Sequence, residues 1–134
     1  MSAATALSTL HTTGAAETLD RIVDVYPAHS QGQIRSQLSN VLVGIISQTL
    51  VPTIDKKGRL AALELLKATD AVSALIREGK IFQIPNSIAT GKAEGMFTLD
   101  QHLAQLVRNG KISEEVARTR CHDRKEFEQY LGSR

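Results

Sequence analysis

The chain has 134 residues, a length that suits a single domain with a substantial hydrophobic core. Hydrophobic residues make up 42% of it and charged residues 22%, which excludes an intrinsically disordered protein. The 16 basic and 14 acidic residues are spread along the sequence and aromatic residues contribute only 4%, so we expect no nucleic-acid partner.

The sequence carries no signal for membrane insertion or secretion. No apolar run reaches the roughly 18 residues of a membrane-spanning helix, so we expect no direct membrane insertion. The opening residues MSAATALSTL lack the basic start and long apolar stretch of a secretory signal. The single Cys121 cannot form an internal disulfide, which agrees with a reducing compartment. A cytoplasmic location is the expectation that follows.

The first part of the chain predicts a short strand and then two helices. Residues 4–10 are apolar and short enough for a buried strand. Two runs of apolar residues at helical spacing follow; Pro27 ends the first, and Ser30 with Gln33 forms a capping-box pattern before the second. The side chains expected on the buried faces are Ala15, Leu19, Ile22, Val23 and Tyr26 in the first helix and Ile34, Leu38, Val41, Leu42 and Ile45 in the second.

The pattern then changes to that of a β-hairpin. The segments IISQTLVPTI and RLAALELL are apolar, and the polar cluster DKKG between them contains the glycine that a turn requires. Pro52 cannot donate a hydrogen bond to a neighbouring strand, so we expect its strand to lie at a sheet edge or to carry a bulge.

From residue 69 onward, capping residues and glycines mark a series of helices, so the expected fold class is α+β and mainly helical. Thr69 or Asp70 can cap the segment AVSALIRE, which ends at Gly79. A short helix is expected from about Pro85 to Gly91. Further N-terminal caps are expected at Thr98 with Gln101, at Ser113, and at Asp123 with Glu126. The expected buried residues are Val72, Leu75, Ile76, Leu99, Leu103, Leu106, Val107, Phe127, Tyr130 and Leu131.

No phosphate-binding loop is recognisable. Such a loop needs several glycines and then a lysine followed by serine or threonine. The Gly-Lys pairs that begin at Gly79, Gly91 and Gly110 are followed by isoleucine or alanine, which cannot supply a hydroxyl group. We therefore expect that this chain alone binds no cofactor and hydrolyses no nucleotide.

Metal and ligand sites are also not predicted. Only the segment RCHD places a thiol, an imidazole and a carboxylate together, at Cys121, His122 and Asp123. Adjacent side chains on a helix point in different directions and a structural zinc site usually has four ligands, so a helix junction is favoured over a metal site. Met96 and Phe97 fall at core spacing, which favours a role in the core over a ligand pocket.

Several segments, in order and spacing, resemble one known family. They are LSTLHTTGAAETLDRIVDVYP, LVGIISQTLVP, LAALELL, AVSALIREGK and IATGKAEGMFTLDQHLAQLVRNGKISEEVA. Together they are similar to the C-terminal portion of the type IV pilus twitching-motility (retraction) ATPases, the PilT family, from about residue 7 to residue 120.

The resemblance implies a fold and a division of the chain. Residues 1–68 would be the C-terminal part of a RecA-like P-loop ATPase core, with one short strand, two helices and a β-hairpin. Residues 69–134 would be a C-terminal helical subdomain, a small bundle. The phosphate loop and the magnesium-binding acidic segments of the family would precede residue 1.

The resemblance also implies a function and partners. The intact protein would be a homo-hexameric motor that uses ATP and magnesium to disassemble pili, working with neighbouring ring subunits and the pilus platform at the cytoplasmic face of the inner membrane. The isolated chain would be inactive. The alternative is a free-standing helical interaction module that is derived from this family. If the chain is the C-terminal part of a motor, an open sheet edge and exposed apolar surface are expected.

Two positions acquire roles from the resemblance. His11 coincides with the family's "His box", which implies that its imidazole senses the terminal phosphate of the nucleotide. AVSALIREGK resembles the family's retraction helix, which implies that Arg77, Glu78 and Lys80 contact a partner or a neighbouring subunit. Without the resemblance, an ordinary loop histidine and a solvated helix face are favoured. Ser73 and Ala74 replace an arginine and an asparagine of the family pattern.

Overall fold

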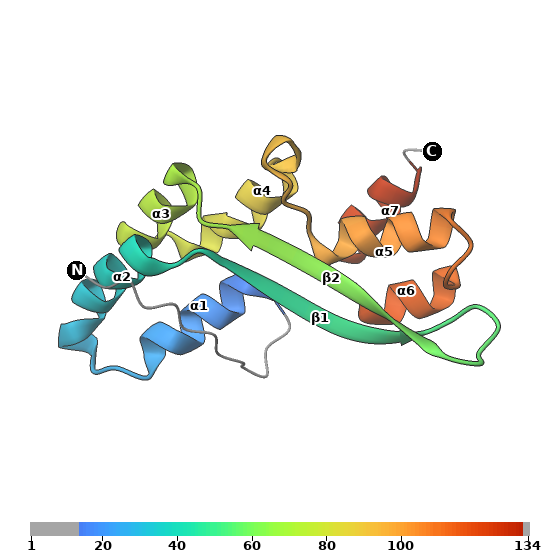
Figure 1. The fold of residues 1–134 in the computed structure, drawn as a ribbon, viewed down its shortest axis with the longest axis horizontal. Coiled ribbons are helices and arrows are strands. Elements are labelled where there is room, and N and C mark those ends of the chain that lie inside the picture. The colour runs from blue at the N-terminus through green and yellow to red at the C-terminus, as the bar shows by residue number, and fades with distance from the viewer. Residues whose placement is uncertain (1–13, 133–134) are drawn as a thin grey trace.

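The computed structural model describes residues 14–132 of the chain. The strand expected at residues 4–10 and His11 lie outside these residues. The described fold is a long β-hairpin with helices at both of its ends (Figure 1). Its elements are α1 (Ala15–Asp24), η1 (Ala28–Ser30), α2 (Gln31–Val41), β1 (Gly44–Pro52), β2 (Arg59–Lys67), α3 (Asp70–Arg77), η2 (Ile81–Gln83), α4 (Ile84–Ala89), η3 (Lys92–Glu94), α5 (Leu99–Arg108), α6 (Glu114–Arg120) and α7 (Arg124–Gly132), where η marks a 3-10 helix.

The predicted hairpin is confirmed. β1 and β2 pair antiparallel in one unbroken register, from Gly44 opposite Lys67 to Pro52 opposite Arg59. Pro52 is the last residue of β1, so the N–H that it lacks interrupts no hydrogen bond in the middle of the strand. In the turn, the backbone N–H of Thr53 donates to the carbonyl of Gly58 at 2.9 Å, which closes the loop over the predicted polar cluster.

The hydrophobic core consists of two clusters, one at each end of the hairpin. The first is built from α1, α3, α4 and the end of β2 around Leu66; the second is built from α5, α6 and α7 around Val51 and Ala62. Figure 1 shows β1 and β2 running between these two helical groups. Because each cluster draws on residues from both sides of position 68, the hairpin joins the two halves, and the division into 1–68 and 69–134 stays a prediction.

Most predicted helix boundaries are confirmed by hydrogen bonds. Thr98 and Gln101 form a reciprocal capping box at α5, and the Ser113 hydroxyl accepts the N–H of Val116 at α6. The Thr69 hydroxyl accepts the N–H of Val72 at α3, and the Asp123 carboxylate accepts that of Glu126 at α7. Gly79 and Gly110 follow α3 and α5 with positive φ angles of 73° and 71°, which glycine adopts at little cost.

Four expectations about the first two helices are wrong. Ser30 makes no side-chain capping bond, because it belongs to η1 and its backbone is already helical where a cap needs extended geometry. Tyr26 lies beyond the end of α1 and is exposed, and Val41 is exposed at the last turn of α2. Ile45 packs against the core from β1 and not from a helix.

No helix in residues 14–132 is long and apolar enough to cross a membrane.

Candidate functional site

A buried carboxylate joins the N-termini of two helices that are far apart in sequence. Glu64 lies on β2 with 6% of its surface exposed. Its Oε1 accepts the backbone N–H of Ala15, the first residue of α1, at 3.0 Å, and its Oε2 accepts that of Leu99, the first residue of α5, at 3.2 Å. Helix N-termini have unpaired N–H groups and a positive dipole end, so they stabilise a negative charge at this place.

A second buried carboxylate binds the connection between α6 and α7. Asp100 is 2% exposed, and its two oxygens accept the backbone N–H groups of His122 at 2.7 Å and Asp123 at 3.0 Å. The His122 Nδ1 lies 4.0 Å from Oε2 of Glu64. Asp100 therefore brings the α6–α7 connection against the Glu64 carboxylate.

Gly14 completes this group, which we call the Glu64 junction: Gly14, Glu64, Asp100 and His122. A Cβ atom at Gly14 would lie 3.1 Å from Cε1 of His122 and 3.3 Å from Oε1 of Glu64. Gly14 has no side chain with which to cap α1, so Glu64 supplies the cap from β2. The first described residue of the chain thus lies against β2 and the α6–α7 connection.

The Glu64 junction is related to His11 only by its nearness in the sequence. His11 lies outside the described residues, and Gly14 follows it three positions later. The chain that leaves the His11 segment is therefore fixed to β2 and, through Glu64, to α5. Sequence reasoning missed Glu64 and Asp100. The available signal was a glutamate in the otherwise apolar strand RLAALELL, at a position that alternation directs inward.

The segment RCHD forms a helix junction, as the favoured prediction held. The three residues make separate contacts: the thiol of Cys121 donates to the carbonyl of Arg118, the N–H of His122 is bound by Asp100, and the carboxylate of Asp123 caps α7. Burial raises the pKa of the Cys121 thiol, which disfavours the thiolate that metals bind. Within residues 14–132, no three histidine, cysteine or acidic side chains gather as a metal site would require.

The other predicted site lies at the end of α3. Arg77, Glu78 and Lys80 are all exposed, while Val72 and Ile76 on the opposite face of the helix are fully buried. The Lys80 ammonium lies 3.5 Å from the Glu78 carboxylate, a solvent-exposed ion pair of small energetic value. The structure thus leaves these side chains accessible, and their role in binding stays a prediction. Ser73 and Ala74 are half-buried.

Comparison with known proteins finds similarity to proteins of pilus retraction. A twitching motility protein of Neisseria gonorrhoeae is 54% identical over 115 residues, which is 86% of this chain and 31% of that protein. The type IV pilus retraction ATPase PilT of Pseudomonas aeruginosa is 50% identical over 113 residues, 84% of this chain and 33% of that protein. A scan of models of protein families gives no match.

The fold agrees with the sequence comparison. A crystal structure of the pilus retraction motor PilT with bound ADP matches 90% of this chain with a TM-score of 0.77 and 42% identity, and this match covers 33% of that chain. The chain therefore spans about a third of the length of the relatives that it matches.

Proposed function

Because the chain is homologous to the PilT family of type IV pilus retraction ATPases, we propose that it supplies the C-terminal part of such a motor. The observation that carries the proposal is 54% identity over 86% of the chain, together with a shared fold at a TM-score of 0.77. In the intact motor ATP would be hydrolysed with magnesium, and the energy would drive pilus disassembly. Alone, the chain would be inactive. The alternative of a free-standing interaction module is not favoured.

The exposed face of the hairpin supports this proposal. Side chains that alternate along β1 and β2 leave one face partly bare, with Ile46 69% exposed and Leu50 47% exposed. Leu63 and Leu65 of β2 share that face through the register and are half-buried. An apolar sheet face of this kind usually packs against another layer. We assign it to contact with the remainder of a RecA-like core.

In the motor, His11 would act as a sensor of the nucleotide's terminal phosphate. An imidazole can donate a hydrogen bond to a phosphate oxygen and so distinguish the states before and after hydrolysis. The Glu64 junction supports this role, because it fixes the chain three residues after His11 to β2 and α5. Movement of the His11 segment would therefore be transmitted to the helices at the C-terminal end.

Arg77, Glu78 and Lys80 would form the contact surface of the motor on α3. Their exposure, on a helix whose other face is buried by Val72 and Ile76, supports this role. The partners would be neighbouring subunits of a homo-hexameric ring and the pilus platform of the inner membrane. The ring would lie at the cytoplasmic face of that membrane, without direct insertion.

A chimera tests the proposed function. The matching segment of the Pseudomonas aeruginosa retraction ATPase is replaced by this chain, and the gene is returned to a strain that lacks the parental protein. We expect twitching to return. A matched chimera that carries Leu103→Asp, a charge in the second core cluster, should not restore it. A stable chimeric ring that leaves the strain non-motile would contradict the proposal.

A further inference from the structure

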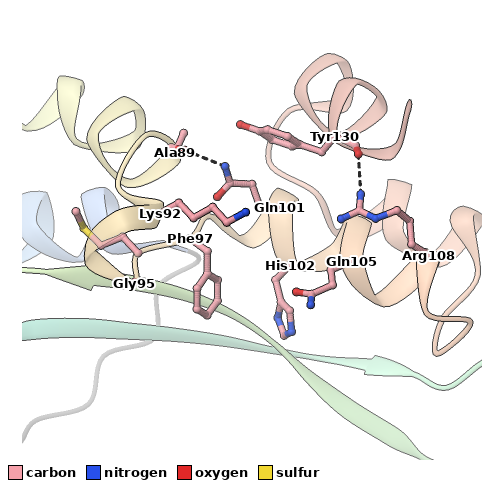
Figure 2. A pocket seen from close by; sticks show the side chains of 10 residues that line it. Ala89, Lys92, Gly95, Phe97, Gln101, His102, Gln105, Arg108 and Tyr130 are labelled. Carbon is pink, nitrogen blue, oxygen red and sulfur yellow. Dashed lines mark hydrogen bonds between the residues drawn. The ribbon is translucent and has the colours of Figure 1, made fainter. Parts of the chain in front are cut away.

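A cleft of about 680 Å³ lies between η3, α5 and α7, on a side of α5 that the Glu64 junction does not use. Figure 2 shows the side chains that line it, among them Lys92, Phe97, His102, Arg108 and Tyr130. The volume falls within the range of roughly 300–1,000 Å³ typical of ligand sites. Neither the sequence prediction nor the proposed function gives this cleft a role.

Aromatic rings form the apolar part of the cleft. The rings of Phe97 and His102 lie 5.5 Å apart between centroids and are tilted by 58°. Nδ1 of His102 accepts the backbone N–H of Leu63 on β2 at 2.8 Å, which fixes the imidazole in place. Since Nδ1 is an acceptor, the proton of the neutral ring is on Nε2. Burial lowers the pKa of His102, so the ring is neutral near pH 7.

The polar walls of the cleft are also preorganised. Gln101 on α5 donates to the carbonyl of Ala89 at 3.0 Å, and Arg108 at the end of α5 donates through Nη1 to the carbonyl of Tyr130 at 2.7 Å (Figure 2). These bonds connect α4 and α7 to the two ends of α5. A binding partner would therefore meet walls that need little further ordering.

The charged side chains that line the cleft are all positive. Lys92 and Arg108 are cationic, and the described residues that line the cleft include no aspartate or glutamate. The Lys92 ammonium and the Gln105 amide have no hydrogen-bonding partner among residues 14–132, and both residues are exposed. The unused donors therefore favour a ligand with negatively charged acceptor groups.

A phosphate group is a poorer match than carboxylates for this cleft. Phosphate sites usually rely on several free backbone N–H groups in a loop. Here each backbone N–H from residue 94 to residue 98 already donates inside the chain, to carbonyls of Gly91, Lys92 and Leu65 or to the Gln101 side chain. Only side-chain donors remain. The stripe of Gln101, Gln105 and Arg108 extends over about 10 Å of α5, enough for three residues of an extended peptide.

We propose that this cleft binds an acidic peptide segment of a partner protein, with an aromatic or aliphatic side chain against Phe97 and His102 and flanking carboxylates at Lys92 and Arg108. The two cationic side chains disfavour basic segments. The apolar floor formed by Phe97 and His102 disfavours acidic segments that lack an apolar side chain. The binding proposed for this cleft does not rest on the proposed function.

Binding is tested on the 134-residue chain by fluorescence anisotropy at low salt. The probe is a labelled nonapeptide with one phenylalanine between pairs of glutamates. Matched peptides carry lysine in place of every glutamate or alanine in place of phenylalanine. We expect the acidic peptide to bind and each matched peptide to bind at least about fivefold more weakly, because each loses one of the two components of recognition.

Variants locate the site. Lys92→Met removes one charge, and Gln105→Glu introduces a carboxylate at an exposed position, so each should weaken binding about three- to fivefold, the range of one exposed charge interaction. Lys57→Met makes the same charge change in the hairpin turn and should leave affinity unchanged.

Any one of three binding results would overturn the proposal, and so would one competition result. The binding results are absence of acidic-peptide binding at millimolar concentration, equal binding of the alanine-substituted peptide, and an equal effect of Lys57→Met. Displacement of the peptide by millimolar inorganic phosphate, with no dependence on the phenylalanine, would also overturn it and assign the cleft to phosphate.

Discussion

Replacement of Glu64 is the sharpest test of how the fold holds its N-terminal segment. In Glu64→Ala, the N–H groups of Ala15 and Leu99 lose their acceptor, at 3.0 Å and 3.2 Å in the native structure. A buried donor without a partner costs about 1–3 kcal/mol, so with two such donors this variant should lose about 2–6 kcal/mol of unfolding free energy. Glu64→Gln keeps one acceptor oxygen and should lose about half as much.

Urea denaturation of the 134-residue chain, followed by circular dichroism, measures these losses. Glu115→Gln on the exposed surface of α6 is the matched control and should change stability by less than about 0.5 kcal/mol. Amide exchange adds a local measure, because the Ala15 and Leu99 protons should gain more in exchange rate in Glu64→Ala than amides in mid-helix positions of α3, which only global unfolding exposes. The reasoning is refuted if Glu64→Ala is as stable as the control or if the Ala15 amide keeps its native protection.

Three further predictions concern other parts of the structure. Gly14→Ala should destabilise the chain by about 1 kcal/mol, because the added Cβ would lie 3.1 Å from His122 Cε1. Adding His122→Ala to that variant should restore most of the lost stability. A double variant that is no more stable than Gly14→Ala contradicts this. Burial holds the pKa of His102 below its ordinary value, so as the pH falls the unfolded chain takes up a proton at this residue before the folded chain does. The contribution of His102 to the unfolding free energy is therefore fully present above about pH 6.5 and is lost as the pH falls below that value. His102→Gln should flatten this part of the pH profile and exposed His29→Gln should not, as urea midpoints between pH 7 and 5 would record. Arg77→Ala should leave unfolding free energy within about 0.5 kcal/mol but reduce twitching by the chimera, and full motility of that variant would remove α3 from the contact surface.

Local signals explain which features of the fold could be predicted. The hairpin, the capping box at Thr98 and the glycine ends at Gly79 and Gly110 depend on residues a few positions apart, and all are confirmed. Ser30 shows the limit of the same signal. Its pattern matches that of Thr98, but the 3-10 turn that precedes α2 gives Ser30 a helical backbone, which removes the capping geometry.

The junction and the cleft depend on contacts across long sequence distances, which a pattern cannot reveal. Glu64 binds amides 49 and 35 residues away, and His102 binds an amide 39 residues away. Spacing identified Met96 as a core residue, which its burial confirms, but the same reasoning placed Phe97 in the core, whereas it is half-buried and lines the cleft. Whether Met96 and Phe97 are buried depends on how the elements around them pack, which residue spacing does not encode.

ATP turnover by a purified chimeric ring tests the central claim most directly. The chimera joins the preceding part of the Pseudomonas aeruginosa retraction ATPase to this chain, and its turnover is compared with that of the parental protein truncated before the matching segment. We predict hydrolysis within about tenfold of the parental rate, and a loss of at least about tenfold on His11→Ala. A chimera that assembles but hydrolyses ATP no faster than the truncated protein would contradict the account.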